Sequence, residues 1–172
     1  QTGTNLNQQK DMIRNVTPTD AKAITDIYNQ YILNTTISFE TAPLTTGQML
    51  ERINDISAEY PYYVYVTEDG SIGGYCYAHR WKEREAYSRT LETTIYLAPH
   101  CQHKGIGHKL MHKLIDECRL RGFVALIACI TGGNEASIGL HASLGFEKKS
   151  HFEKVGIKFG EMLDVVDMEL LL

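Results

Sequence analysis

The segment 91–119 constrains the fold of this chain more than any other stretch. Alternating side chains from Leu91 to Leu97 predict a strand, and Pro99 ends it. Gly105 and Gly107 then open a run whose apolar residues recur at helical spacing, which predicts a long helix. A strand, a glycine loop and a helix in this order suit a phosphate group. The glycines let the backbone approach a ligand, and the N–H groups of the first helical turn favour an anion.

The glycine loop by itself leaves two interpretations open. A Gly-x-Gly at the start of a helix is more often a plain turn than a nucleotide site. No Gly-Lys-Ser/Thr follows at Walker spacing, and the third glycine of the dinucleotide fingerprint is absent. The remaining pattern is Gln102-x-x-Gly105-x-Gly107, to which His103 and Lys104 would add positive charge.

This pattern resembles the acetyl-CoA pyrophosphate loop of the GNAT acyltransferase superfamily. The downstream order is similar too, with a strand at 123–130, a helix that begins at Asn134, and an ending of the form Leu-Gly-Phe at 144–146. Other segments resemble one branch, the phosphinothricin and methionine sulfoximine N-acetyltransferases. These segments are 34–40, 81–87, 90–92 and 156–164. The resemblance covers the chain from about Ile13 to its end.

Length and composition fit one globular domain. The chain has 172 residues, of which 43% are hydrophobic and 22% charged, enough to bury a proper core. We predict a flexible N-terminal arm at 1–11 and a single domain at 12–172. The resemblance implies an α/β (α+β) fold, with a mixed, mostly antiparallel twisted sheet of about six or seven strands and helices on both faces. The sheet would open near its centre to admit acetyl-CoA.

Local signals place the other elements. An Asp69-Gly70 turn between two β-rich runs at 62–67 and 72–79 predicts a hairpin, and Gly73 and Gly74 weaken its second strand or mark a bulge. Besides these, we predict strands at 13–16, 147–153 and 163–172, helices from the Thr17-Pro18-Thr19 entry through Tyr31 and at 45–56, and a glycine-bounded loop at 155–160.

Several partner classes are disfavoured. The net charge is −4 and no basic stripe is interleaved with aromatic residues, which argues against nucleic acid. We recognise no long apolar segment and no signal peptide, so we expect a cytoplasmic protein without a membrane partner. The cysteines lack Cys-x-x-Cys spacing and the histidines lack metal spacing, so we expect reduced thiols and no metal.

Glu92 is the candidate base. Alternation places Thr90, Glu92, Thr94 and Tyr96 on one face of the strand, where a glutamate could simply be solvated. Acetyl transfer to an alkylammonium requires a base beside the acceptor nitrogen. In the resembling branch a glutamate at this place does that work.

His141 is the second catalytic candidate. It lies five residues before Phe146, where many superfamily members carry a tyrosine that protonates the departing CoA thiolate. A histidine there could donate that proton or share the base role with Glu92, because its unperturbed pKa is near neutrality. Otherwise His141 is a helix-face residue bonded to the backbone.

The resemblance implies the remaining site residues. Acetyl-CoA is the only cofactor it implies, with the strand before the loop supplying an oxyanion N–H and pairing with the pantetheine arm. The implied cofactor-binding residues are Ile95, Tyr96, Leu97, Gln102, His103, Lys104, Gly105, Ile106, Gly107, His108, Asn134 and Ser143. The implied acceptor-binding residues are Phe39, Lys82, Glu83, Arg84, Glu92, Thr93 and Thr94.

Two of the acceptor assignments have plain structural alternatives. Phe39 could plug the core from a loop, which physics alone favours. Lys82 and Arg84 could clamp an acidic group of the acceptor, since Arg grips such groups with two hydrogen bonds, or they could lie on a solvated loop anchored by Trp81.

The sequence thus predicts an enzyme that moves acetyl from acetyl-CoA to the primary amine of a small amino-acid-like acceptor by direct attack. Phosphinothricin, methionine sulfoximine and methionine sulfone are the acceptors that the resemblance implies. The alternatives are a polyamine or protein N-terminal acetyltransferase of the same fold, or a CoA-binding module without catalysis. The branch also implies a homodimer. Cys101 lies in the loop but is expected to pack and not to form an acyl-enzyme.

Overall fold

The computed structural model describes residues 12–172, so the predicted N-terminal arm at 1–11 lies outside the described residues. One seven-stranded sheet runs in the order β1-β2-β3-β4-β5-β7-β6. Every neighbouring pair is antiparallel except β4 and β5, which are parallel. This confirms the mixed, mostly antiparallel sheet. The strands are β1 (Met12–Asn15), β2 (Tyr62–Val66), β3 (Ile72–Arg80), β4 (Thr90–Leu97), β5 (Ala125–Thr131), β6 (Glu147–Lys158) and β7 (Glu161–Leu171).

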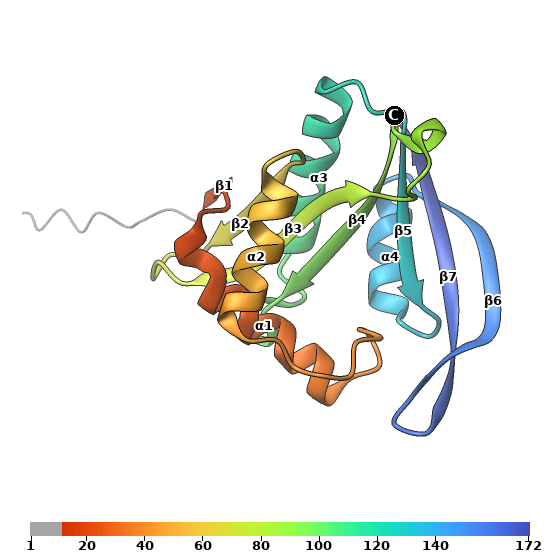
Figure 1. Ribbon diagram of the computed structural model, residues 1–172, viewed down its shortest axis with the longest axis horizontal. Coiled ribbons are helices and arrows are strands. Elements are labelled where there is room, and N and C mark those ends of the chain that lie inside the picture. Colours follow the sequence, from red (N-terminus) through yellow and green to blue (C-terminus); the bar gives the residue numbers. More distant parts are fainter. Residues whose placement is uncertain (1–11) are drawn as a thin grey trace, which may run out of the picture.

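Helices cover both faces of the sheet, as predicted. The helices α1 (Ala21–Asn34) and α2 (Thr46–Ser57) lie on one face, while α3 (Ile106–Leu120) and α4 (Glu135–Ser143) lie on the other (Figure 1). Helix α2 begins with a capping box in which Thr45 and Gln48 satisfy each other's backbone N–H groups. The predicted and observed bounds of this helix differ by one residue at each end.

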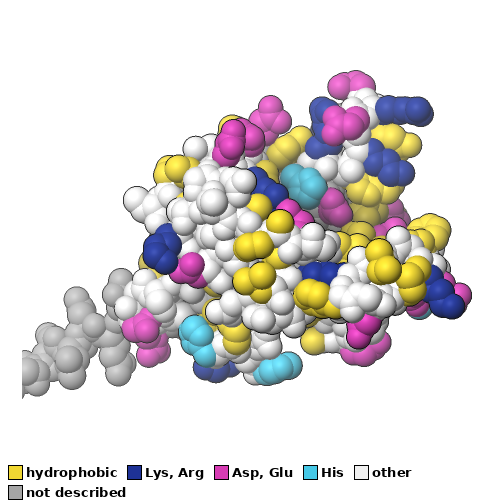
Figure 2. Space-filling model, turned by 60° about the horizontal axis from the view of Figure 1, so that its bottom comes forward, with side chains coloured by type: hydrophobic (Ala, Val, Ile, Leu, Met, Phe, Trp, Pro, Cys, Tyr) yellow, Lys and Arg dark blue, Asp and Glu magenta, His cyan; other side chains and the backbone are white. Residues whose placement is uncertain are grey.

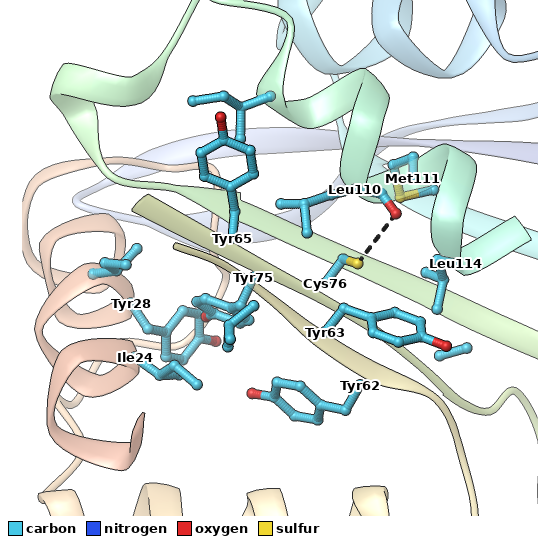
Figure 3. Close-up of a cluster of buried hydrophobic side chains, with 14 of the residues drawn as sticks. Ile24, Tyr28, Tyr62, Tyr63, Tyr65, Tyr75, Cys76, Leu110, Met111 and Leu114 are labelled. Atoms are coloured by element: carbon cyan, nitrogen blue, oxygen red, sulfur yellow. Dashed lines mark hydrogen bonds between the residues drawn. The ribbon is translucent and has the colours of Figure 1, made fainter. Parts of the chain in front are cut away.

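The core has two chemically different sides. On the side of α1, stacked tyrosines from β2 and β3 meet Ile24 and Tyr28 (Figure 3). On the side of α3, the Cys76 thiol donates to the carbonyl oxygen of Leu110 at 3.5 Å, among fully buried Met111 and Leu114. Successive residues of a strand point to opposite faces, so β3 divides its side chains between the two layers.

The sheet divides in the middle. Strands β4 and β5 pair over only four residues of each, Thr90–Thr93 with Ala125–Ala128. Beyond Thr93, β4 continues to Leu97 along β3 alone. The two strands therefore diverge, which opens the sheet near its centre as the sequence predicted.

The predicted hairpin and its bulge are confirmed. β2 and β3 flank the Asp69-Gly70 turn, and the register jumps so that Tyr65 pairs with Gly74 while Val66 pairs with Ile72. Gly73 is left as the extra residue. A side chain there would meet the Cys101 sulfur at 2.8 Å, so only glycine fits the bulge.

The predicted loop at 155–160 is wrong. β6 runs on to Lys158, and only Phe159 and Gly160 form the turn to β7. A register shift between Phe152 and Gly156 absorbs extra residues as a bulge, with Lys154 at φ 55°. Both oxygens of Asp164 hold this bulge, one accepting from the Lys154 N–H at 2.9 Å and the other from His151 Nε2 at 2.8 Å. The glycines there mark a bulge and a tight turn.

Across residues 12–172, none of the helices combines the length and the apolar character that a membrane crossing requires.

Candidate active site

A cavity of about 630 Å3 occupies the place where β4 and β5 diverge. Its volume lies within the range of small-molecule and cofactor sites. Its walls come from α1, the loop after α1, β4, β5, the glycine loop and α4. Residues far apart in the sequence thus meet at one opening of the sheet.

The glycine loop forms one end of the cavity. Gly105 precedes α3 in a left-handed conformation at φ 78°, which glycine adopts at little cost. The first helical bond runs from the Lys109 N–H to the Gly105 carbonyl oxygen, so the preceding N–H groups have no partner within the helix. Gly105, Gly107, His103 and His108 line the cavity. These groups fit the anionic pyrophosphate of acetyl-CoA.

Other loop residues are placed differently. The Gln102 side chain donates to the Tyr31 hydroxyl at 3.0 Å, and that hydroxyl donates to the Leu97 carbonyl oxygen. Gln102 thus joins the loop to α1 while also lining the cavity. Ile106 is buried in the core, and Lys104 is exposed outside the lining.

The open edge of β4 presents backbone donors to the cavity. The Ala98 N–H donates to the Gly73 carbonyl oxygen on the β3 side at 2.9 Å. Because N–H groups alternate in direction along a strand, those of Ile95 and Leu97 point to the opposite side, where β5 has diverged. Both residues and Tyr96 line the cavity.

Glu92 lies on the cavity wall beside a histidine that the sequence did not single out. Glu92 Oε2 is 3.3 Å from His79 Nε2, and the two residues pair across β3 and β4. The Glu92 side chain is 27% exposed, so it is neither solvated nor sealed in the core. Thr93 and Thr94 line the same cavity. The pairing of Glu92 with His79 depends on strand register, which the sequence does not display.

His141 is buried on α4 and reaches the cavity. Its Nδ1 is 2.7 Å from the Ser137 carbonyl oxygen, which can only accept, so Nδ1 carries the hydrogen. The ring also packs edge-on against Phe146. Burial lowers the pKa of His141, opposed by the bond to Ser137. The neutral ring therefore leaves Nε2 as a hydrogen-bond acceptor.

Phe39 lines the cavity and is 41% exposed, so its interpretation as a core plug is wrong. Asn134 lies at the opposite wall and caps α4, with its side-chain oxygen accepting from the Ser137 N–H at 3.3 Å. Ser143 lies outside the lining, where its hydroxyl donates to the Leu140 carbonyl oxygen.

The structure does not bring Lys82, Glu83 and Arg84 to the cavity. All three side chains are exposed, and the Lys82 ammonium lies 4.3 Å from the centre of the Trp81 ring. Their contribution to acceptor binding stays a prediction.

Cys129 on β5 lines the cavity, although no sequence pattern singled it out for this site. Partial burial and the charges of Asp167 and Glu92 raise the pKa of its thiol to about 12. A thiol that stays protonated is a poor nucleophile, which agrees with direct transfer. Within residues 12–172, no group of three or more His, Cys, Asp or Glu side chains could hold a metal ion.

Comparisons with known proteins give a consistent result. Residues 13–166 match the family model described as "Acetyltransferase (GNAT) domain". A phosphinothricin N-acetyltransferase from Alcaligenes faecalis is 38% identical over 159 residues, covering 91% of this chain and 80% of that protein. An L-methionine sulfoximine/L-methionine sulfone acetyltransferase from Salmonella typhimurium is 37% identical over 161 residues, covering 93% and 94%.

A solved structure agrees in fold. It is a GNAT superfamily phosphinothricin acetyltransferase from Sinorhizobium meliloti in complex with AcCoA. It superimposes with a TM-score of 0.92 at 36% identity, covering 95% of this chain and 89% of the other.

Proposed function

This chain belongs to the GNAT acetyltransferase family, and from that premise we propose that it acetylates the primary amine of a small amino-acid-like acceptor. It is an acetyl-CoA-dependent N-acetyltransferase. We propose acceptors of the phosphinothricin, methionine sulfoximine or methionine sulfone type. The observation that carries the mechanism is that Glu92 and the N–H groups of Ile95 and Leu97 that face the cavity lie on one strand at the opening of the sheet.

Glu92 would act as the base. An alkylammonium has no lone pair for attack, so the Glu92 carboxylate accepts its proton directly or through a water molecule. The neutral amine would then attack the thioester carbonyl carbon of acetyl-CoA, and the C–S bond would break as the amide forms, with CoA leaving as a thiolate that takes up a proton released from the amine. The N–H groups of Ile95 and Leu97 would stabilise the negative charge that develops on the acetyl oxygen.

His141 would support proton acceptance and not donation. Its hydrogen is on Nδ1 and bonded to Ser137, so the neutral ring has no proton on Nε2 to give to a departing thiolate. With Nε2 as an acceptor, His141 can take a proton or hold a water molecule on the path from the acceptor.

The cavity lining supports cofactor-binding and acceptor-binding roles for several residues. Gly105, Gly107 and His108 are proposed to hold the pyrophosphate, and Asn134 to bond the pantetheine arm, because all four line the cavity. Phe39 is proposed to border the acceptor.

The test is thiol release from acetyl-CoA with methionine sulfoximine, methionine sulfone, phosphinothricin, spermidine and a short peptide. For Glu92→Gln we expect kcat/KM on the preferred acceptor to fall by about 10²- to 10⁴-fold with acetyl-CoA affinity unchanged. Glu68→Gln, at an exposed turn, is the matched control. Full activity of Glu92→Gln would refute the base assignment.

A cationic acceptor is the second candidate. The residues lining the cavity include two carboxylates, Glu40 and Glu92, and no Lys or Arg among the described residues. Arg52 neutralises Glu40 in an ion pair, so Glu92 is the carboxylate at the cavity that would attract a polyamine. Turnover of spermidine alone in the same panel would select it.

We further propose a homodimer. The β6–β7 hairpin exposes large apolar side chains, and Figure 2 shows hydrophobic side chains gathered on the face toward which this hairpin extends. These exposed residues are Phe152, Val155, Ile157, Phe159 and Met162. Light scattering after size exclusion should give twice the monomer mass, and a monomer mass would refute the dimer.

We propose residues 12–172 as one catalytic domain located in the cytoplasm. Its seven strands form one sheet with a shared cavity. The cytoplasm is supported by the dependence on acetyl-CoA and by the buried thiols of Cys76 and Cys118, which suit a reducing compartment. Fractionation of cells that produce the full chain tests the location.

A further inference from the structure

The loop between α1 and α2 forms the acceptor side of the cavity and bridges the two halves of the sheet. Ile37, Ser38, Phe39 and Glu40 from this loop line the cavity. The loop contacts helices α1 and α2, which pack on strands β2–β4, and it also contacts strands β5 and β6 across the opening. Its position therefore depends on both sides of the opening.

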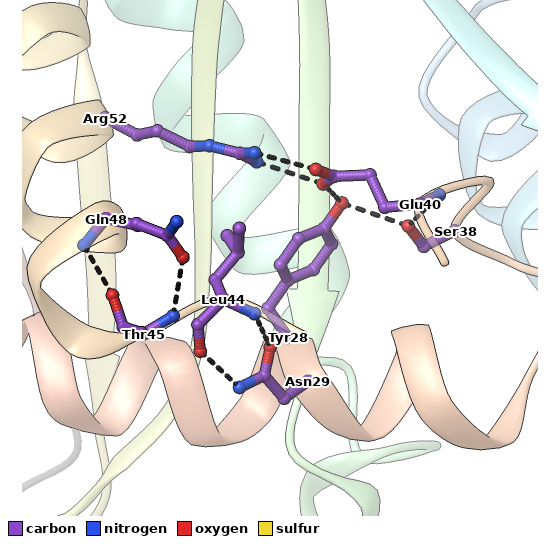
Figure 4. A network of polar contacts seen from close by, with 8 residues as sticks. All are labelled: Tyr28, Asn29, Ser38, Glu40, Leu44, Thr45, Gln48 and Arg52. Atoms are coloured by element: carbon purple, nitrogen blue, oxygen red, sulfur yellow. Dashed lines mark hydrogen bonds and ion pairs between the residues drawn. The ribbon is translucent and has the colours of Figure 1, made fainter. Parts of the chain in front are cut away.

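Helices α1 and α2 hold one side of the loop. The Arg52 guanidinium binds the Glu40 carboxylate with two bonds of 3.0 and 2.7 Å, and the Tyr28 hydroxyl bonds both Ser38 and Glu40 (Figure 4). These charge-assisted bonds fix the carboxylate of Glu40.

Strands β5 and β6 hold the other side. The Thr131 hydroxyl lies 3.1 and 3.0 Å from the carbonyl oxygens of Thr36 and Ile37. The Phe39 ring packs on Gly156, where an added Cβ would lie 2.6 Å from the ring. The bulge held by Asp164 places Gly156 at this contact.

Lys158 completes this contact from the last position of β6. Its side chain is buried, with the residue only 3% exposed, and Nζ donates to the Ser38 carbonyl oxygen at 2.6 Å. Burial of an ammonium group costs free energy unless it is well bonded. Burial lowers the pKa of Lys158, and the negative charge of Glu40 partly opposes this shift. Filling space beside an acceptor pocket with a buried lysine therefore costs more free energy than filling it with an apolar side chain.

The turn after Lys158 also helps to position this lysine at the end of β6. Lys158 pairs with Glu161, so Phe159 and Gly160 form a two-residue turn, with φ values of 52° and 75°. Positive φ at both positions is typical of the type I′ hairpin turn, but it is unfavourable for phenylalanine. The tight turn ends β6 at the point where Lys158 meets Ser38.

We propose that Lys158 is a positioning residue for the acceptor. This proposal rests on the proposed acetyl-transfer function. By bonding the Ser38 carbonyl oxygen, it joins the second half of the sheet to the loop and sets where Phe39 and Glu40 stand in the acceptor pocket. Lys158 itself lies outside the cavity lining and does not touch the acceptor.

The first test compares Lys158→Met, which keeps the aliphatic stem, with Lys158→Arg, which keeps a donor. We expect Lys158→Met to raise the KM for the preferred acceptor about tenfold, as for the loss of one charge-assisted hydrogen bond, with kcat and the KM for acetyl-CoA within about twofold of wild type. Lys158→Arg should recover most of the acceptor affinity. An unchanged acceptor KM in Lys158→Met, or an equal rise of both KM values, would overturn the proposal.

Gly156→Ala provides a second variant that leaves the lysine in place. Its methyl group would displace the Phe39 ring, so the acceptor KM should rise while the KM for acetyl-CoA stays constant. Lys149→Met, an exposed lysine of the same strand outside the bulge held by Asp164, is the control and should change neither. A Gly156→Ala enzyme with wild-type acceptor KM would contradict the role of this loop in acceptor positioning.

Amide hydrogen exchange separates the proposal from the proposed function. In Lys158→Met, the amides of residues 37–40 should exchange faster than in wild type and in Lys149→Met. If wild type turns over no acceptor, the proposed function fails, and this measurement still decides whether Lys158 holds the loop. Unchanged exchange of residues 37–40 would overturn the proposal in either case.

Discussion

At the residue scale, ion pairs of similar geometry stabilise the fold to different extents because their burial differs. Asp20 is buried at the entry to α1 and accepts two bonds of 2.8 Å from Arg14, whereas Lys22 and Asp26 form an exposed pair on the surface of α1. Burial alone would raise the pKa of Asp20, but the bonds from Arg14 and Thr17 hold it below its usual range. The buried carboxylate is thus kept charged by its partners.

Replacing these aspartates should therefore have unequal effects. Asp20→Asn leaves the Arg14 guanidinium without its anion, so we expect the free energy of unfolding to fall by about 2 kcal/mol. Asp26→Asn removes only a solvated pair and should cost at most about 0.5 kcal/mol. Urea unfolding of both variants at neutral pH provides the comparison, and equal losses would contradict the assignment.

His141 should make stability depend on pH. Burial lowers its pKa in the folded state, while the unfolded chain titrates near 6.5, so the unfolded state binds more protons between these values. The free energy of unfolding should then fall as the pH drops below about 6.5 and continue to fall until the lowered pKa is passed. His141→Gln should remove this part of the slope in urea unfolding at pH 7.5 and 5.5. His100→Gln, on an exposed turn, should keep it, and identical slopes in all three proteins would contradict the prediction.

The sequence could identify single residues where a backbone pattern fixed them. The need for a base and the family resemblance singled out Glu92, which lines the cavity, and the glycine loop predicted the start of α3. His79 could not be found in this way because strand register brings it to Glu92, and Cys129 could not because it lies on β5 beyond the pairing with β4. Phe39 was ambiguous since a loop aromatic can fill a core or line a pocket.

At the element scale, a glycine before a helix and a glycine inside a helix have opposite effects on stability. Gly105 precedes α3 at φ 78°, while Gly139 lies inside α4 with open space where a side chain would stand. Gly105→Ala should destabilise the protein by about 1 kcal/mol, because L-residues disfavour this conformation. Gly139→Ala should stabilise it by about 0.5 to 1 kcal/mol. Thermal unfolding checks both signs, and stabilisation by Gly105→Ala would contradict the strained entry to α3.

Elements with local signals were predictable, and those shaped by distant contacts were not. The Asp69-Gly70 turn and the Thr45 cap are local, so the β2–β3 hairpin and α2 appear within one residue of their predicted bounds. The second half of β6 depends on pairing with β7 and on Asp164, so its glycines resembled loop signals. The same distant contacts place Lys158 against Ser38.

At the scale of the whole molecule, the fold consists of two sheet halves joined by a short parallel contact. Strands β1–β4 form one half and β5–β7 the other, and four paired residues of β4 and β5 connect them. The cavity exists because the pairing stops at Thr93, and the loop after α1 reaches across it. The sheet topology thus creates the cavity, and the side chains at the opening supply its chemistry.

Binding of acetyl-CoA should complete this incomplete sheet. The Ile95 and Leu97 N–H groups point to the side where β5 is absent, so a ligand arm that pairs with this edge should slow their exchange with solvent, whereas the Leu91 and Thr93 amides already face β5. Amide exchange followed by NMR, with and without saturating acetyl-CoA, resolves these residues individually. General stabilisation by a ligand would slow all of them in proportion, so selective protection of Ile95 and Leu97 distinguishes strand-like pairing from mass action alone. Equal protection along β4 would mean that the ligand binds without using the open edge, and the oxyanion role of these amides would then be lost.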